Sequence, residues 1–377
     1  MSKRLYVVAG EHSGDNHGAG LLAELQQLAP GLSIQGHGGP MMAEVTGGAV
    51  RDWLEGAAVM GLWEVIKRYG WFKERMEEMV AEIVECRPDV LLLVDYPGFN
   101  LRLAARIREV LPEIKIIDFI SPQVWAWKKG RIPKMAELLD RMICLFPFEQ
   151  KIFEEAGLET VCCGHPMLDE IPDPAPTREP DLVALLPGSR MTEIRRLLPT
   201  MLEAGLILQE CTPGRELRFH LAAASEHLAE TIREELDRRG LAGPEWEVRR
   251  EETRDLMSRA AVGAVASGTA SLEAAILGLP YCLVYRIAPA TYAAARVLVD
   301  IPHIGMANVL AGRAIVKELI QDAATPEALA AELQRLLRDP VAREEVAAAY
   351  GELRSGLGES GAYRRAAAAV GTSLEEG

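Results

Sequence analysis

Residues 265–281 read VASGTASLEAAILGLPY, and the order of residue types in this stretch indicates the kind of fold to expect. An apolar run gives way to the small residues Ser267, Gly268 and Thr269, and a helix-forming run follows that stops at Gly278. This order predicts a strand, a tight turn, a helix and a second strand, which is the unit of a parallel sheet. A helix that begins near Thr269 would direct unpaired backbone N–H groups and the positive end of its dipole toward an anion.

Glu273 lies four residues beyond Thr269 and therefore on the same face of the predicted helix. A carboxylate there can accept hydrogen bonds from a ribose diol, while the turn from Ser267 to Ala270 holds a diphosphate. The motif alone does not decide the matter, because every α/β protein has several strand-to-helix turns with small residues. A purely structural turn is the alternative.

Composition limits the class of protein. A chain of 377 residues, 49% hydrophobic and 25% charged, is typical of a globular protein with two domains. Its net charge of −14 argues against general nucleic-acid binding, which needs a basic face. The six cysteines form no CxxC motif, so neither a disulfide framework nor a zinc site is indicated. Neither a signal peptide nor an apolar run of about 20 residues is found, so we expect a cytoplasmic protein whose membrane contact is peripheral.

Apolar runs of strand length alternate with longer helical patterns, which predicts an α/β fold with parallel sheets covered by helices on both faces. Residues 171–181, IPDPAPTREPD, contain four prolines and cannot continue a helix or a central strand. We therefore expect an N-terminal domain at 1–170 and a C-terminal domain at 182–340. The sequence leaves open whether helices within 341–377 pack back on the N-terminal domain. Ligands of such sheets bind beyond the carboxyl ends of the strands, so we expect the active site in the cleft between the domains.

The loop after the first strand, residues 9–15 with the sequence AGEHSGD, holds more polar side chains than a turn requires. It lacks the GxGxxG pattern of a dinucleotide site. The functional interpretation places it against an acceptor substrate, through Glu11, Ser13, Gly14 and Asp15. In the structural alternative, Ser13 or Asp15 caps the following helix.

Asp95 ends the apolar strand of VLLLVDYPGFN, residues 90–100. A carboxylate at the carboxyl end of a central strand is well placed to act as a general base, although it could instead cap the next helix. Another strand leads into ISPQVWAW, residues 120–127, where Ser121 and Trp125 precede a basic turn. These residues could form apolar surface beside phosphate-binding charge, or simply a core with a solvated turn.

Two further segments have unusual patterns. LLPGSRMTEI, residues 185–194, offers the backbone N–H groups of Gly188 and Ser189 and the planar guanidinium of Arg190, all suited to phosphate oxygens. Residues 59–76 form a basic, aromatic-rich amphipathic pattern that could lie at a membrane surface or face a core. The residues predicted to contact a membrane are Trp63, Ile66, Lys67, Arg68, Trp71 and Phe72.

Taken together, these segments resemble the lipid-A-disaccharide synthase family, glycosyltransferase family 19. The motifs occur in order from Ala9 to Gln321: AGEHSGD, GGPMM, AVMG, DYPGFN, ISPQVWAW, PFE, GHP, LLPGSR, SGTASLE and NVLAGRAIVKELIQ. The resemblance implies a GT-B fold of two Rossmann-like domains and an inverting transfer that needs no metal or cofactor. The implied substrates are UDP-2,3-diacylglucosamine and 2,3-diacylglucosamine 1-phosphate, and the implied products are a β-1,6-linked disaccharide 1-phosphate and UDP.

The resemblance also implies residue roles. Asp95 would remove the proton from the acceptor 6-hydroxyl, Arg190 and the two N–H-rich turns would stabilise departing UDP, and Glu273 would hold the ribose. Asn308, in the segment after the penultimate strand, would approach the nucleotide. Because both substrates carry acyl chains, segment 59–76 would contact the inner leaflet of the inner membrane. The resemblance leaves open whether the chain forms a homo-oligomer.

The chain departs from the family pattern at two places. Other members carry Leu-Pro before the asparagine that matches Asn308, where this chain has Met306-Ala307, and some carry Asp in place of Gly98. Two other functions fit the same architecture: a UDP-sugar 2-epimerase, for which the amphipathic segment has no purpose, and a GT-B transferase of peptidoglycan precursors, whose N-terminal loop is richer in glycine.

Overall fold

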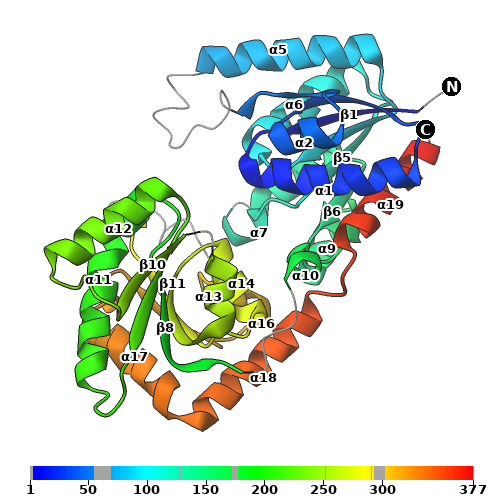
Figure 1. Ribbon diagram of the computed structural model, residues 1–377. Helices are drawn as coiled ribbons and strands as arrows, with labels where there is room; N and C mark the ends of the chain where they lie inside the picture. Colours follow the sequence, from blue (N-terminus) through cyan, green and yellow to red (C-terminus); the bar gives the residue numbers. More distant parts are fainter. Residues whose placement is uncertain are drawn as a thin grey trace. The chain divides into compact units, whose positions relative to one another are not determined.

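The computed structural model describes residues 3–54, 69–127, 129–171, 177–250, 252–289, 291–292 and 302–376. The chain divides into two compact units (Figure 1). Unit 1 comprises Met1–Asp169 and Leu357–Gly377, and unit 2 comprises Glu170–Gly356. The whole of the predicted linker, residues 171–181, therefore falls in unit 2, whose first strand already begins at Glu179.

Unit 1 is built on a seven-stranded sheet in the order β3-β2-β1-β4-β5-β6-β7, and its strand pairs are parallel. All five residues of β4 are buried, as expected for a parallel sheet covered on both faces. Helices α1, α2 and α19 lie on one side of the sheet, and α5, α6 and α8 lie on the other (Figure 1). The strands are β1 Arg4–Ala9, β2 Ser33–Gly38, β3 Val50–Asp52, β4 Val90–Val94, β5 Lys115–Phe119, β6 Arg141–Cys144 and β7 Glu159–Cys162. The helices are α1 His12–Leu28, α2 Pro40–Val45, α5 Tyr69–Cys86, α6 Pro97–Val110, α7 Val124–Trp127, η1 Lys129–Arg131, α8 Ile132–Leu138, α9 Pro147–Glu154, α10 Met167–Glu170 and α19 Ala362–Glu376.

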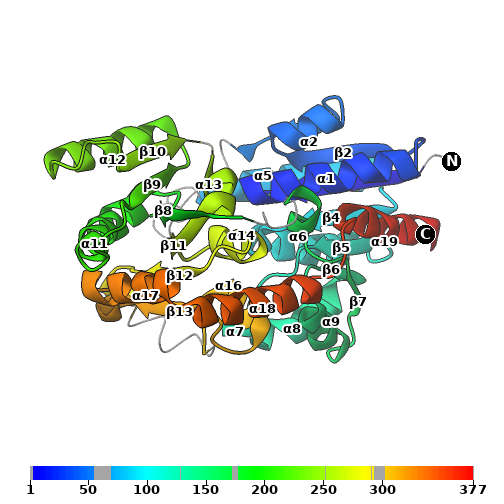
Figure 2. The same ribbon diagram turned by 60° about the horizontal axis from the view of Figure 1, so that its bottom comes forward.

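Unit 2 is built on a six-stranded parallel sheet in the order β10-β9-β8-β11-β12-β13. Helices α11 and α17 pack together on one side of it, and α13 and α14 lie on the other (Figure 2). The strands are β8 Glu179–Leu186, β9 Arg218–Ala223, β10 Trp246–Arg250, β11 Ala260–Ala266, β12 Tyr281–Tyr285 and β13 Lys317–Ile320. The helices are α11 Met191–Glu210, α12 Glu226–Arg238, α13 Thr253–Arg259, α14 Thr269–Ile276, α16 Met306–Ala311, η2 Gln321–Ala323, α17 Pro326–Arg338 and α18 Pro340–Gly356.

The predicted α/β class with parallel sheets is confirmed. The sequence reading missed two strands, β3 with the sequence VRD and β13 with the sequence KELI. Both lie at the edge of their sheet, and charged residues are common on edge strands because they discourage pairing with another chain. Strands were predicted from apolar runs, and the charged residues in VRD and KELI interrupt any such run.

The C-terminal residues divide between the two units. Helix α18 stays in unit 2, where the Arg354 guanidinium donates to the backbone oxygen of Ile276 at 3.4 Å. Helix α19 lies against α1 in unit 1, where the Tyr363 hydroxyl and His17 Nδ1 are 2.9 Å apart. Gly20 makes this approach possible, since a Cβ there would lie 2.6 Å from the Tyr363 ring. Among the described helices, none combines the length and hydrophobicity needed to cross a bilayer.

Candidate active site

A cavity of about 320 Å³ in unit 2 opens at the carboxyl ends of β8, β9 and β11. It brings together the two stretches that the sequence analysis selected, LLPGSR and SGTASLE. This is the edge of the sheet at which parallel α/β folds bind ligands. Its lining consists of Leu186, Gly188, Ser189, Arg190, Glu193, Ala222, Ala224, Thr253, Ala266, Ser267, Gly268, Thr269, Ala270 and Glu273.

Helix α14 begins at Thr269, as predicted. Its N-cap residue is Gly268, whose φ of 143° is a conformation that L side chains rarely adopt. The Ser271 hydroxyl donates to the Gly268 carbonyl at 2.7 Å and fixes the turn. Within the described part of the chain, no protein acceptor meets the N–H groups of Thr269 and Ala270. These groups are therefore available to an anion in the cavity.

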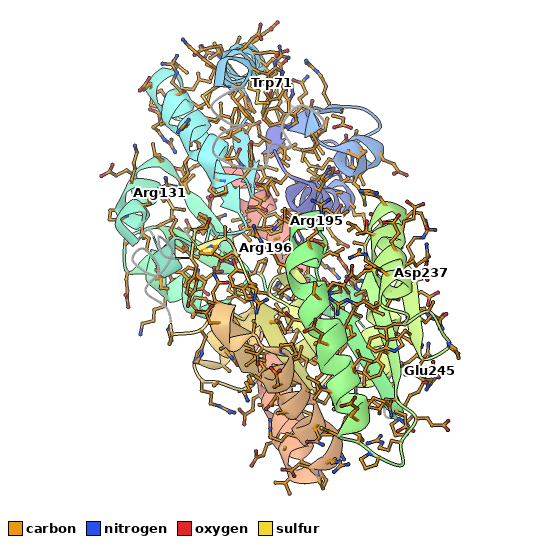
Figure 3. All side chains as sticks on the ribbon, turned by 90° about the vertical axis from the view of Figure 1, so that its left-hand side faces the viewer. Trp71, Arg131, Arg195, Arg196, Asp237 and Glu245 are labelled. Atoms are coloured by element: carbon orange, nitrogen blue, oxygen red, sulfur yellow. The ribbon has the colours of Figure 1, made fainter. Side chains whose placement is uncertain are left out.

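The loop before α11 is held by Glu193, which the sequence analysis overlooked. One oxygen of its carboxylate accepts the Ser189 N–H at 3.1 Å, and the other lies 3.3 Å from the Arg190 guanidinium. Gly188, with φ 112°, packs against this side chain so closely that a Cβ would lie 2.3 Å from it. A glutamate three residues after the helix N-cap resembles a capping box, and that spacing was the available signal. Two arginines, Arg195 and Arg196, extend from the exposed side of the same helix (Figure 3).

Glu273 lies on α14 with 16% of its side chain exposed, and Arg254 on α13 contacts it. Arg254 Nε donates to Glu273 Oε1 at 3.0 Å, and its terminal nitrogen lies 2.9 Å from the same oxygen. That nitrogen also donates to Glu170 at 2.8 Å. Burial alone would lower the pKa of Arg254, but its hydrogen bonds to Glu170 and Glu273 outweigh burial and raise that pKa. The sequence analysis did not identify Arg254.

Asn308 is a correction, because it does not line this cavity. Its side chain is fully buried and donates to the Val316 carbonyl at 2.9 Å and to Glu318 at 2.8 Å. Its oxygen accepts the N–H groups of Ile315 and Val316 at 2.7 and 2.9 Å. Every hydrogen-bonding group of the amide is thus engaged within the protein. In this structure Asn308 stabilises the turn between α16 and β13.

Asp95 follows the last residue of β4 in unit 1. It and the next residue, Tyr96, both have left-handed backbones, with φ of 47° and 65°. Such strained residues cluster at functional sites. The Ser13 hydroxyl donates to one carboxylate oxygen of Asp95 at 3.0 Å, and the Tyr96 N–H donates to the other at 2.9 Å. Helix α6 begins at Pro97 with Tyr96 as its N-cap, so Asp95 is not the residue that caps it.

Asp118, on the neighbouring strand β5, was not singled out from the sequence. It is 2% exposed, and burial first and the charge of Asp95 second raise its pKa well above the usual range for aspartate. Burial and the charge of Asp95 therefore both favour the protonated form of Asp118. The signal was a single aspartate within the apolar strand KIIDF.

The loop from Glu11 to Asp15 serves two different roles. Asp15 is 1% exposed, and its carboxylate accepts the N–H groups of Gly39, Met41 and Met42 at 2.9 to 3.0 Å. It thus caps α2, and its place on the acceptor side of a cleft stays a prediction. Glu11 and Ser13 are exposed at the start of α1, and buried Gly14 lets that helix approach Asp95, whose Cβ would lie 3.3 Å from a Cβ at Gly14.

Ser121 and Trp125 are also buried, at 6% and 8% exposure. The Trp125 indole N–H donates to Glu149 at 3.0 Å, and its ring meets Phe148 edge to face. Burial raises the pKa of Glu149, although hydrogen bonds from its neighbours oppose the rise. The surroundings of Trp125 agree with the core alternative, and its assignment to an apolar acceptor surface stays a prediction.

Of the predicted membrane-contact residues, Trp63, Ile66, Lys67 and Arg68 lie outside the described residues. Trp71 and Phe72 lie in the first turn of α5 and are partly buried. Figure 3 labels Trp71 on this helix. Trp71 stacks on Trp53 with ring centres 5.7 Å apart, and Phe72 lies 6.3 Å from Phe99. This end of the amphipathic segment thus packs against the core of unit 1.

Two Rossmann-like units, each with a parallel sheet, define the class of GT-B glycosyltransferases. Solved structures with this fold include the calicheamicin glycosyltransferase CalG4, with a TM-score of 0.58 at 15% identity over 100% of this chain and 99% of that chain. A UDP complex of MnaA from S. aureus gives a TM-score of 0.64 at 11% identity over 100% and 97%. At these identities the likeness shows the fold alone.

The family described as lipid-A-disaccharide synthetase matches residues 5–370. Relatives called lipid-A-disaccharide synthase include one from Trichlorobacter lovleyi, 39% identical over 99% of this chain and 98% of the relative. One from Geobacter metallireducens is 39% identical over 98% and 97%, and one from Myxococcus xanthus is 37% identical over 97% and 96%. The chain therefore belongs to the lipid-A-disaccharide synthase family of glycosyltransferases, and the resemblance drawn from its motifs is confirmed.

Proposed function

We propose that this protein transfers 2,3-diacylglucosamine from UDP-2,3-diacylglucosamine to 2,3-diacylglucosamine 1-phosphate, with inversion at the anomeric carbon. The products are a β-1,6-linked disaccharide 1-phosphate and UDP. The observation that carries the proposal is the shared cavity of LLPGSR and SGTASLE, in which anion-binding groups and the carboxylate of Glu273 meet. Membership of the family supplies the class of lipid A precursor sugars.

In this proposal unit 2 holds the donor. The diphosphate is bound by Arg190, by the N–H groups at Gly188 and Ser189, and by the first turn of α14. Negative charge grows on the β-phosphate as its bond to the sugar breaks, and prearranged donors stabilise that charge best when they need not reorganise. The contact of Glu193 with Ser189 and Arg190 supports such prearrangement. Glu273 accepts hydrogen bonds from the ribose.

Asp95 of unit 1 is the proposed general base. It takes the proton of the acceptor 6-hydroxyl while the oxygen forms its bond to the anomeric carbon and the electron pair of the breaking bond passes to UDP. A carboxylate has about four acceptor positions, and the donors Ser13 and Tyr96 occupy one on each oxygen of Asp95. The remaining positions can receive the hydroxyl. Burial and the charge of Asp95 favour the protonated, uncharged form of its neighbour Asp118.

We further propose that the protein is cytoplasmic and meets the inner leaflet of the inner membrane through segment 59–76. The acyl chains of both substrates and the basic, aromatic composition of the segment support this contact. Since Trp71 stacks on Trp53, a change at Trp71 would disturb the core, and Trp63→Ser with Lys67→Glu is the better test. Flotation with anionic liposomes should fall for that double variant and stay high for Lys134→Glu, a control at an exposed position of α8 outside the segment. Unchanged flotation would refute the contact.

The deciding experiment incubates the pure protein with both acylated substrates and follows UDP and disaccharide phosphate by mass spectrometry. Release of UDP without disaccharide, or intact substrates, would refute the transfer. A UDP-sugar 2-epimerase would instead convert UDP-N-acetylglucosamine without an acceptor, and a peptidoglycan transferase would need an undecaprenyl-linked acceptor. Asp95→Asn should abolish turnover and preserve UDP binding. Its control is Asp89→Asn at the amino end of the same strand, where the carboxylate accepts the Arg4 N–H at 2.7 Å.

A further inference from the structure

We propose that Arg254 is a positioning residue for Glu273 and makes the nucleotide pocket selective for a ribose over a deoxyribose diphosphate. The inference rests on the proposed function, because it takes Glu273 to be the residue that meets the ribose. It adds a residue and a specificity that the pocket motifs themselves do not contain.

The first step of the argument is which oxygen Arg254 contacts. Both of its nitrogens that reach Glu273 lie within 3.0 Å of the same atom, Oε1. In the described part of the chain no hydrogen bond occupies Oε2. One oxygen is therefore held by the protein, and the other remains available to a hydroxyl in the pocket that Glu273 lines. A diol that must donate to a carboxylate needs this arrangement.

The second step is that Arg254 is itself held. Its terminal nitrogen donates to Glu170 at 2.8 Å, so the guanidinium bridges two carboxylates of unit 2, that of Glu170 at the first residue of the unit and that of Glu273 within α14. The side chains of Glu170 and Arg254 are 45% and 44% exposed, whereas that of Glu273 is 16% exposed. The bridge thus runs from the surface to the edge of the pocket. A planar guanidinium with donors in a fixed fork holds both partners in a defined geometry, whereas a lysine ammonium is a point charge on a flexible stem.

The third step is energetic. A free glutamate side chain loses rotamer freedom when it binds a ligand, at a cost of up to about 2 kcal/mol. If Arg254 has already fixed that side chain, the cost is removed from ribose binding, which is the ordinary effect of preorganisation. The gain applies only to a ligand whose hydroxyl meets Glu273. Arg254 should therefore change the preference for ribose more than it changes affinity in general.

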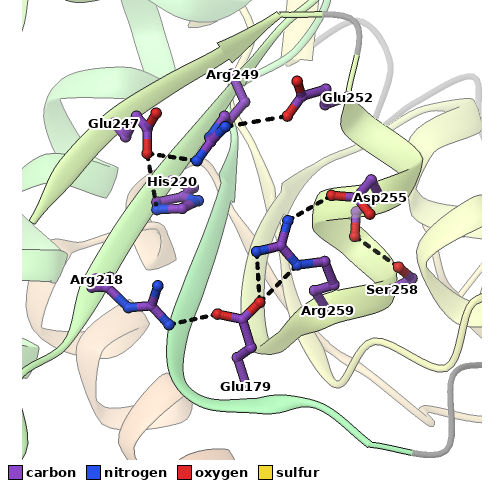
Figure 4. A network of polar contacts seen from close by, with 9 residues as sticks. All are labelled: Glu179, Arg218, His220, Glu247, Arg249, Glu252, Asp255, Ser258 and Arg259. Carbon is purple, nitrogen blue, oxygen red and sulfur yellow. Dashed lines mark hydrogen bonds and ion pairs between the residues drawn. The ribbon is translucent and has the colours of Figure 1, made fainter.

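The same helix offers a matched control. Arg259 ends α13 and also bridges two carboxylates, donating to Glu179 at 2.7 Å and to Asp255 at 2.8 Å (Figure 4). It does not line the pocket. Arg254→Met and Arg259→Met thus remove the same charge and a similar pair of contacts from one helix, and only the first should alter nucleotide selectivity.

The experiment measures binding of UDP and of 2′,3′-dideoxy-UDP to the full chain by calorimetry. A hydrogen bond to a charged group implies that the unchanged protein prefers UDP by about 10- to 100-fold. Arg254→Met should reduce this preference by about five- to tenfold, because Glu273 must then be ordered by the ligand. The preference of Arg254→Lys for UDP should lie between that of the unchanged protein and that of Arg254→Met. Glu170→Gln, which disturbs only the exposed end of the bridge, should give a smaller reduction, and Arg259→Met none.

The outcomes separate the inference from the proposed function. If Arg254→Met weakens both nucleotides equally, Arg254 acts on the diphosphate or on folding, and the inference is overturned. If Glu273→Gln removes the preference while Arg254→Met and Glu170→Gln both retain it, the ribose assignment stands and the inference alone fails. If the unchanged protein shows no preference or binds no UDP, the proposed donor site itself fails, and the inference with it.

Discussion

The pair of carboxylates Asp95 and Asp118 gives a prediction of stability against pH. Asp118 is buried, and burial together with the charge of Asp95 raises its pKa. In the unfolded chain the group titrates near its ordinary value of about 3.9. Between that value and the raised pKa, the folded protein retains one proton that the unfolded chain releases. Stability therefore falls as pH rises through this window.

The magnitude follows from linkage. One retained proton lowers the free energy of unfolding by about 1.4 kcal/mol for each pH unit above about 4. Asp118→Asn removes the titrating group and nearly preserves its shape. Within the window between the ordinary and the raised pKa of Asp118, the variant should gain about 1.4 kcal/mol for each pH unit relative to the unchanged protein. The change of slope is the expected result, because the absolute stability of the variant also contains any lost hydrogen bond.

Urea unfolding followed by tryptophan fluorescence provides the assay. Five of the six tryptophans, all except Trp246, belong to unit 1, so the signal reports mainly the unit that contains Asp118. Buried His165 acts in the opposite direction, because burial first and the charge of His17 second lower its pKa to about 4. The difference between variant and unchanged protein cancels that contribution.

Glu82, in the same unit, provides a control because its pKa is shifted in the opposite direction from that of Asp118. Burial alone would raise the pKa of Glu82, but hydrogen bonds from Tyr6 and His37 and the charge of Arg51 outweigh burial and lower it. Its stabilisation is present above the ordinary glutamate pKa and is lost as pH falls. Glu82→Gln should therefore leave the slope between pH 5 and 6 unchanged. Equal slopes for Asp118→Asn and the unchanged protein would refute the assignment of a neutral Asp118.

Three further predictions concern the site and its supports. Glu193→Gln keeps an acceptor for the Ser189 N–H but loses the ion pair to Arg190, and calorimetry should show UDP affinity reduced by about three- to tenfold. Gly268→Ala forces a side chain into φ 143°, which should cost about 1 to 3 kcal/mol in unit 2, measured by urea unfolding, and lower UDP affinity. Asp15→Ala leaves three N–H groups without their acceptor, two of them buried, and unit 1 should lose about 2 to 4 kcal/mol in fluorescence-detected unfolding, with UDP affinity unchanged.

The sequence predicted the local parts of the candidate site well. The start of α14 at Thr269 and the turn at Gly188 follow from residues next to each other in the chain, because small residues and glycines with positive φ are local requirements. That both stretches line one cavity followed from the parallel order of β8 and β11, whose carboxyl ends lie side by side.

Contacts between distant residues could not be predicted in this way. Arg254 meets Glu273 across 19 positions, and Asp15 meets the start of α2 across 24 or more. The residues around Asp15 suit a cap of its own helix equally well, and only the register of β1 with β2 brings α2 within reach. Trp125 was ambiguous for a related reason, since nothing near it in the chain shows that Glu149 will receive its indole N–H.

Three aspartates of unit 1 show why residue type alone cannot assign a base. Asp15 accepts three backbone N–H groups and is almost fully buried, so little acceptor capacity remains. Asp118 is buried, and its raised pKa favours the protonated form, which cannot take a further proton. Asp95 has one donor on each oxygen and is partly exposed, so of the three it alone combines open acceptor positions with access for a ligand. The proposed base therefore follows from counting donors and exposure around each carboxylate, and the same count predicts that neither Asp15→Asn nor Asp118→Asn can reproduce the loss of turnover expected for Asp95→Asn.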